Sequence, residues 1–147
     1  MPPIKSVEKL GWKTFDGKTE TLGGLKGKVV VLDFWATFCP PCLEEIPHLV
    51  RLQNDNADSI QVVGLHVGGD DDRPKIPAFA EKLKINYLLA YPEDALTNTL
   101  LGGDDAIPQT LVFDREGKLV RKFVGFDDEI KFNLDFAIQE ALNKSKS

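Results

Sequence analysis

Residues 28–35 constrain the fold more than any other part of the chain. They read KVVVLDFW, a run of β-branched and apolar residues. A strand that is buried on both faces has this continuous pattern, whereas a strand with one wet face alternates apolar and polar residues. Residues 60–67 have the same character. Two such strands predict a parallel sheet with helices on both faces, which is a three-layer α/β/α domain.

Helices and antiparallel strands are expected around these two strands. Amphipathic stripes predict the helices, and turn residues separate the short apolar runs that are typical of strands. An N-terminal hairpin and a later antiparallel pair make the predicted sheet mixed. In chain order, the remaining expected elements are a hairpin over 12–22, a helix from 40 to about 53 that bends or restarts at Pro47, a helix over 77–84, a strand over 87–90, a helix over 94–101, strands over 109–113 and 119–124, and a helix from about 127 to 142.

The whole chain, residues 1–147, is expected to form one domain, with residues from about 144 to 147 as a disordered tail. Its net charge of −5 and its lack of a Lys- or Arg-rich run argue against nucleic-acid binding. No stretch approaches the roughly 20 apolar residues that span a bilayer. The first residues lack the apolar core of a signal peptide, so no leader or membrane tether is expected in this sequence, although Met1 could open either a native chain or one trimmed of its leader.

The chain has two cysteines, Cys39 and Cys42. A disulfide-stabilised secreted domain has more, spread widely enough to close long loops. A bridge across two intervening residues closes almost no loop and adds little to the free energy of unfolding. The pair is therefore placed for chemistry rather than for stability.

The two cysteines lie where the strand over 28–35 gives way to a helix. Cys39 is expected at the N-cap, where its sulfur faces backbone N–H groups at the positive end of the helix dipole. That position lowers the thiol pKa and favours the thiolate, which is the attacking species. Cys42 lies one turn later, so we expect Cys39 to attack a disulfide and Cys42 to resolve the mixed disulfide. The alternatives are two core cysteines without function, or a zinc half-site completed by His48 and His66.

Residues 26–47, with Cys39-Pro40-Pro41-Cys42 among them, resemble the thioredoxin-like TlpA/ResA group. Ile107-Pro108-Gln109-Thr110 resembles the cis-proline loop of that group, and residues 62–64 and 113–118 also fit. The resemblance implies a thioredoxin fold and a redox-active disulfide, with no cofactor and no metal. Members of the group are bacterial, usually face the periplasm or the outer cell surface, and mostly act as reductants, for example in cytochrome c maturation. Two residues depart from the group. Phe38 replaces its usual Trp, and Asp33 stands where the group more often has Asn. An Asp at this strand position resembles ordinary thioredoxin instead.

Two acidic residues are candidates for proton transfer. Asp33 lies in a strand that is apolar on both faces, so burial should raise its pKa and suit it to accept the proton of Cys42. Its alternative is an Asp at a strand edge, bonded to a neighbour. Glu45 lies three residues after Cys42, near it on the helix surface, and the resemblance implies that it tunes the cysteine pKa and partner recognition. Its alternative is an ordinary solvated helix face.

The substrate-binding candidates surround the cysteines. If the bond between Ile107 and Pro108 is cis, the backbone of Ile107 lies beside the disulfide and can pair with an extended substrate segment; the alternative is a trans proline at a strand start. Trp35 and Phe38 are expected to flank the cysteines as packing and an apolar rim, together with Pro40 and Pro41, although Trp35 could serve the core alone. Three further features are expected to be structural: His48 on the surface, His66 late in its strand, and residues 70–72 as a solvated turn.

These features predict a protein disulfide reductase. Pro40 and Pro41 lack N–H groups, so few donors stabilise the Cys39 thiolate, and that makes the couple more reducing. The expected partners are protein disulfide substrates and an upstream thiol electron donor, and the protein is expected to be a monomer. The resemblance implies a periplasmic or other extracytoplasmic location, with the cytoplasm as the alternative.

Two other functions remain open at this point. One is a thiol peroxidase, although no Pro stands four residues before Thr37 in the peroxiredoxin manner. The other is a copper-binding metallochaperone module that uses Cys39, Cys42 and His66. Peroxide consumption and the metal content of the reduced protein would distinguish these functions from disulfide reduction.

Overall fold

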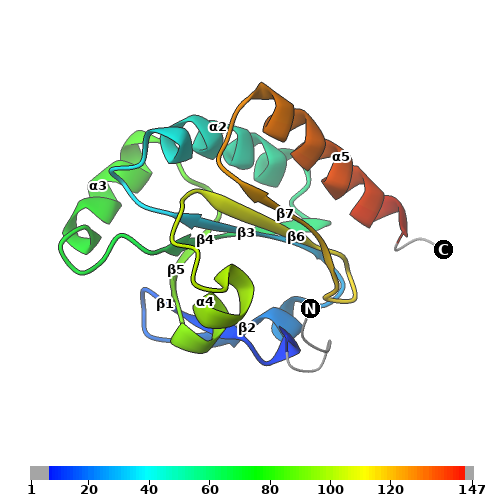
Figure 1. The fold of residues 1–147 in the computed structure, drawn as a ribbon, viewed down its shortest axis with the longest axis horizontal. Coiled ribbons are helices and arrows are strands. Elements are labelled where there is room, and N and C mark those ends of the chain that lie inside the picture. Colours follow the sequence, from blue (N-terminus) through cyan, green and yellow to red (C-terminus); the bar gives the residue numbers. More distant parts are fainter. Residues whose placement is uncertain (1–6, 145–147) are drawn as a thin grey trace.

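One mixed sheet carries the helices of the computed structural model, which describes residues 7–144 (Figure 1). Its strand order is β2-β1-β5-β4-β3-β6-β7. The strands are β1 (Gly11–Thr14), β2 (Thr19–Thr21), β3 (Val29–Trp35), β4 (Ile60–His66), β5 (Leu88–Pro92), β6 (Gln109–Phe113) and β7 (Leu119–Val124). The helices are α2 (Pro40–Asp55), α3 (Ile76–Lys82), α4 (Asp94–Leu101) and α5 (Asp128–Lys144), with short 3-10 turns η1 (Leu22–Leu25) and η2 (Arg73–Lys75).

Strand β3 lies inside the sheet between β4 and β6, and every residue in it is buried. It pairs in parallel with β4 and antiparallel with β6, and β4 pairs in parallel with β5. The N-terminal hairpin β1–β2 extends the sheet beyond β5, so that β2 is one edge strand and β7 is the other. The predicted mixed sheet with an N-terminal hairpin is therefore confirmed.

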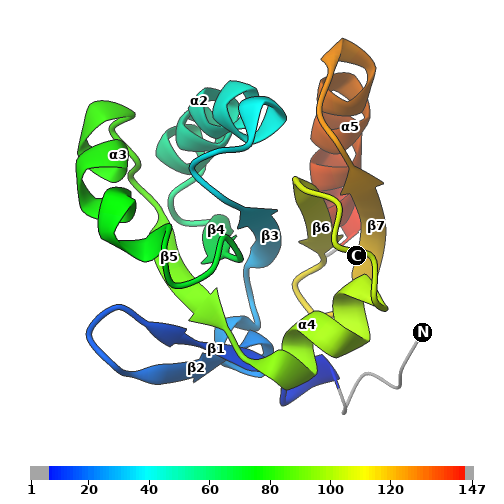
Figure 2. The same ribbon diagram turned by 60° about the vertical axis from the view of Figure 1, so that its left-hand side comes forward.

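Helices cover both faces of the sheet. Figure 2 shows α2, α3 and α5 on one side and α4 on the other. On the α2/α5 side, Leu49 and Leu134 pack with Val31 of β3; on the opposite side, Leu96 and Leu100 of α4 belong to the same cluster as Leu32. The side chains of β3 thus alternate between two apolar cores, which is why the strand is apolar on both faces. The three-layer α/β/α thioredoxin fold is confirmed.

Several boundaries differ from the sequence prediction. Helix α2 runs without a restart through Pro47 to Asp55, because its inward face is held by the core. Strand β5 extends to Pro92, since β1 pairs along it and Trp12 lies opposite Pro92. The predicted tail at 144–147 falls mostly outside the described residues, and Lys144 itself ends α5. No helix within residues 7–144 combines the length and the apolar character needed to cross a membrane.

The topology brings three segments to one edge of the sheet. Strand β3 ends at Trp35, four residues before Cys39, and α2 begins at Pro40. The register places Trp35 opposite His66 at the end of β4, and Phe34 opposite Gln109 at the start of β6. The loops that follow β3 and β4 and the loop that precedes β6 therefore meet at this edge.

Candidate active site

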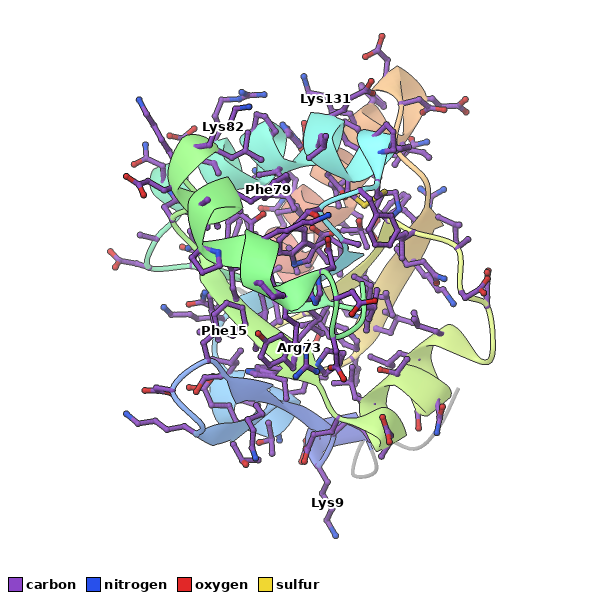
Figure 3. All side chains as sticks on the ribbon, turned by 90° about the vertical axis from the view of Figure 1, so that its left-hand side faces the viewer. Lys9, Phe15, Arg73, Phe79, Lys82 and Lys131 are labelled. Carbon is purple, nitrogen blue, oxygen red and sulfur yellow. A yellow bond between two sulfur atoms is a disulfide. The ribbon has the colours of Figure 1, made fainter. Side chains whose placement is uncertain are left out.

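Cys39 and Cys42 form a disulfide at the start of α2 (Figure 3). Cys39 is the N-cap residue, with extended backbone, and its sulfur accepts a hydrogen bond from the N–H of Cys42 at 3.3 Å. Cys39 is 5% exposed, whereas Cys42 is fully buried. Because a partner can reach only an exposed sulfur, the geometry allows attack through Cys39 and an internal exchange with Cys42.

The two residues between the cysteines limit the hydrogen bonds available to Cys39. An N-cap side chain ordinarily accepts from the N–H of the second or third helical residue. Here Pro41 is the second residue and has no N–H, so the bond comes from the third, Cys42. Pro40 is exposed and Pro41 half-buried beside the disulfide. Fewer donors mean a less stabilised thiolate at Cys39 in the reduced state.

Asp33 and Glu45 are fully buried, and Glu45 shares the buried face of α2 with Cys42. Neither oxygen of Asp33 has a hydrogen-bond partner, whereas Glu45 Oε2 accepts from Thr110 Oγ1 at 2.8 Å. Burial, together with the repulsion of Glu45, raises the pKa of Asp33 well above its ordinary value. Burial also raises the pKa of Glu45 to about 7, against the hydrogen bond from Thr110. The site therefore holds two carboxyl groups that resist ionisation near neutral pH.

Asp33 is buried as predicted, but Glu45 is buried more deeply than the sequence predicted. Glu45 was expected on the helix surface, yet it shares the inward face of α2 with Cys42, while Glu44 is exposed. Asp33 lies in β3, opposite Gly64 of β4 and Thr110 of β6, so the alternative of an Asp at a strand edge is wrong. Tyr87 is a third titratable residue of this buried group. Burial, together with the nearby Asp33 and Glu45, raises the pKa of Tyr87 well above its ordinary value.

The loop before β6 approaches the disulfide from the other side. The peptide bond between Ile107 and Pro108 is cis, and Pro108 is buried. Ile107 packs against the apolar cluster that contains Cys39 and Cys42. The carbonyl of Pro108 accepts a hydrogen bond from Gly125 at 2.8 Å, which ties this loop to the end of β7. The backbone of Ile107 is thus held beside the cysteines.

The two aromatic candidates have different surroundings. Trp35 is 1% exposed and stacks on Phe79 of α3, with ring centroids 5.4 Å apart. Its burial fits the core role and excludes a place in the rim. Phe38 is 64% exposed next to Cys39, Leu43 is exposed one residue after Cys42, and Val124 is exposed at the end of β7, opposite Gln109. We call these three exposed apolar side chains, Phe38, Leu43 and Val124, the apolar rim.

Sequence reasoning missed a second polar group at this edge. Asp72 was expected in a solvated turn, but it is buried and binds both Thr37 and His66. His48 was expected on the surface, but it is buried between helices and its Nε2 lies 2.6 Å from Asp135 Oδ1. The pairs Thr37–Asp72 and His48–Asp135 are separated by 35 and 87 residues, so no local sequence pattern predicts them.

The histidines do not join the cysteines. His66 Nε2 lies 2.8 Å from Asp72 Oδ2 and is therefore engaged away from the disulfide. Among residues 7–144, no three His, Cys, Asp or Glu side chains are grouped so that they could hold a metal ion. The three-ligand copper site of Cys39, Cys42 and His66 is thus not assembled.

Comparison with known proteins identifies one matching family model and several relatives. A family model described as Redoxin matches residues 5–138. The thioredoxin-like protein YneN of Bacillus subtilis is 29% identical over 117 residues, which cover 77% of this chain and 66% of YneN. The thiol-disulfide oxidoreductase ResA of the same organism is 28% identical over 113 residues, covering 75% and 60%. The chain thus spans about two thirds or less of the length of these relatives.

A solved structure has the same fold over nearly its whole length. The thiol:disulfide interchange protein of the thioredoxin family from Chlorobium tepidum superimposes with a TM-score of 0.76 at 29% identity. The match covers 92% of this chain and 96% of that one.

Proposed function

Because this chain belongs to the redoxin family, as a thioredoxin-like protein of the TlpA/ResA type, we propose that it is a thiol–disulfide oxidoreductase that reduces disulfides in other proteins. One observation carries the proposal: Cys39 and Cys42 form a disulfide in which the slightly exposed Cys39 caps a helix and Cys42 is buried. This asymmetry supports an attacking role for Cys39 and a resolving role for Cys42.

The first step starts from the reduced protein. The Cys39 thiolate attacks one sulfur of a substrate disulfide; a bond forms between that sulfur and Cys39, and the other substrate sulfur leaves as a thiolate. The backbone of Ile107 lies beside the cysteines and can pair with an extended segment of the substrate. The apolar rim of Phe38, Leu43 and Val124 offers contact area around the reacting sulfur.

The second step releases the substrate. Cys42 loses its proton and attacks the Cys39 sulfur, the protein disulfide forms, and the second substrate sulfur leaves as a thiolate. Because Cys42 is buried, a nearby base must take its proton, and the buried carboxyl pair is suited to the task. Asp33 and Glu45 share this role, with Glu45 titrating near neutral pH. Two electrons pass from the dithiol to the substrate, and an upstream thiol donor restores the dithiol.

The residues at the start of α2 set the expected direction of electron transfer. Pro40 and Pro41 supply no N–H, so the thiolate of the reduced form is weakly stabilised and the couple is reducing. The resemblance to the TlpA/ResA group supports an extracytoplasmic protein that supplies reductant to other proteins, with cytochrome c maturation as one such process. A copper-binding or thiol peroxidase role has no specific feature in its favour.

Trapping of mixed disulfides tests the proposal. Cys42→Ser should accumulate adducts with protein disulfides, because Cys39 can attack but nothing resolves the product. Cys39→Ser should trap almost none, since the remaining thiol is buried. Equal trapping by the two variants would contradict the assignment, and a wild-type protein unable to reduce a protein disulfide such as insulin would contradict the function itself.

A further inference from the structure

The loop that presents Cys39 is held by a carboxylate from another part of the chain. Thr37, two residues before Cys39, donates its backbone N–H to Asp72 Oδ2 at 2.9 Å, and its hydroxyl donates to Asp72 Oδ1. His66 Nε2, at the end of β4, lies 2.8 Å from the same Oδ2. A carboxylate can only accept hydrogen bonds, so Nε2 carries a proton. Both oxygens of Asp72 are thus engaged, in contacts that span 35 residues of sequence.

Burial distinguishes Asp72 from its neighbours in the acidic run. Asp72 is 4% exposed, whereas Asp70 and Asp71 are exposed. A carboxylate removed from water is costly unless donors surround it. Burial alone would raise the pKa of Asp72, but the hydrogen bonds from Thr37 and His66 outweigh it and hold that pKa below its ordinary value. The group is therefore an ionised, fully bonded carboxylate rather than a solvated one.

The surroundings leave this carboxylate little freedom. A Cβ at Gly68 would lie 2.6 Å from Asp72 Oδ2 and 2.8 Å from His66 Nε2, so a larger residue there would displace the network. The His66 ring contacts Trp35 edge-on, with centroids 5.4 Å apart, and the N–H of Val67 donates to the carbonyl of Trp35 at 2.9 Å. Figure 3 shows Arg73 and Phe79 on the η2–α3 segment that follows Asp72.

We propose that Asp72 is a positioning residue for disulfide exchange, which fixes the loop over 36–38 and so aims Cys39 and the rim residue Phe38 at an incoming disulfide. His66 in turn holds Asp72. Phe38 is largely exposed and has little packing of its own to hold it, so the fixed point of the loop is its neighbour Thr37. Small displacements of a reacting group cost large factors in rate, so the clamp matters for the attack. The inference rests on the proposed oxidoreductase function.

Single-turnover kinetics of the reduced protein with insulin across pH test this role. Asp72→Ala removes the charge and the clamp, Asp72→Asn removes the same charge but keeps an acceptor oxygen, and Asp71→Ala removes an exposed charge from the adjacent position. Asp72→Ala should slow mixed-disulfide formation by about tenfold to a hundredfold. Asp72→Asn should recover most of that loss, and Asp71→Ala should react like the wild type. The apparent pKa of Cys39 should be higher in Asp72→Ala than in Asp72→Asn, since only the former lets the sulfur leave its N-cap position.

Equal rates and equal Cys39 pKa values for Asp72→Ala and Asp72→Asn would overturn the proposal, because both lack the charge and only Asn keeps an acceptor that can hold Thr37. If Asp72→Ala does not fold, Thr37→Val provides the test: it removes the hydroxyl donor but keeps the backbone N–H. Thr37→Val should slow the attack by a smaller factor, and an unchanged rate would overturn the clamp. A wild-type protein that does not reduce insulin would instead contradict the oxidoreductase function.

Discussion

Glu45 on α2 accepts a hydrogen bond of 2.8 Å from Thr110 on β6, across 65 residues of sequence. Thr110 is also the register partner of Asp33 on β3, so this one hydroxyl lies beside both buried carboxyl groups. It satisfies one oxygen of Glu45 and none of Asp33. Two carboxyl groups in such a dry site cannot both ionise cheaply. The pair therefore retains a proton near neutral pH, as the proposed proton transfer from Cys42 requires.

The reduction potential is the first quantity to measure. With few donors at the helix start, the Cys39/Cys42 couple is expected at about −200 to −280 mV. Equilibration with glutathione or dithiothreitol buffers, followed by quantification of free thiols, gives the value. A potential near about −120 mV would make the protein an oxidant and would contradict the reductase function.

Restoring one N–H at the helix start should raise that potential. Pro41→Ala introduces a donor at the second helical position, from which an N-cap side chain can accept. One hydrogen bond to the charged thiolate contributes about 1.5–3 kcal/mol, which corresponds to a shift of about 30–65 mV toward less negative values. Pro40→Ala is the matched control, because the N–H of the first helical position points away from the cap. Equal shifts in both variants would show that proline stiffness, not the missing donor, sets the potential.

Asp33→Asn should slow the release of the mixed disulfide while leaving its formation nearly intact. Cys42 needs a base only in the second step, and Asn cannot accept a proton. Stopped-flow reduction of a disulfide substrate, with the two steps resolved across pH, measures both rates. If the resolution step and its pH dependence stay unchanged, Asp33 is structural and Glu45 becomes the remaining candidate base.

The pH dependence of stability should report on Glu45. Its pKa rises from 4.5 to about 7 on folding, so the folded state binds the proton more tightly. The resulting stabilisation is complete below pH 4.5 and is lost as the pH rises to about 7, a change of about 3 kcal/mol in the free energy of unfolding. Glu45→Gln should remove most of this decline in urea titrations, because Gln does not titrate.

The exposed neighbour Glu44→Gln is the control for that experiment and should leave the pH profile unchanged. Asp33 contributes a decline of the same sign to the wild type and to both variants, since its pKa is also raised. A Glu45→Gln profile as steep as that of the wild type would mean that Glu45 is ionised throughout.

Phe38→Ala should impair protein substrates selectively. The side chain is 64% exposed beside Cys39, and its contact area is available only to a partner large enough to cover it. Loss of part of a buried Phe contact should lower the rate with insulin by about threefold to tenfold, with little effect on a small aromatic disulfide. Phe132→Ala, at an exposed Phe on α5, is the matched control. Equal losses with both substrates would mean that Phe38 stabilises the loop and does not contact the protein substrate.

The amino-acid sequence by itself determined the elements and the reacting pair. Strands β3 and β4 are apolar on both faces, and this local pattern was enough to predict a buried parallel pair. The position of Cys39 between a strand and a helix likewise follows from adjacent residues. The residue pattern that predicts these features lies within a few consecutive positions, although the pairing of β3 with β4 is itself a contact across 31 residues.

The tertiary structure alone decided which polar groups surround the cysteines. Thr110 reaches Glu45, Asp72 reaches Thr37, and His48 reaches Asp135, over separations of 65, 35 and 87 residues. Each of these side chains would be solvated on an isolated helix or loop, and none carries a local signature of burial. Strand order and register bring the partners together. Exclusion of water then raises the pKa of Glu45, whereas the hydrogen bonds from Thr37 and His66 keep Asp72 ionised despite its burial.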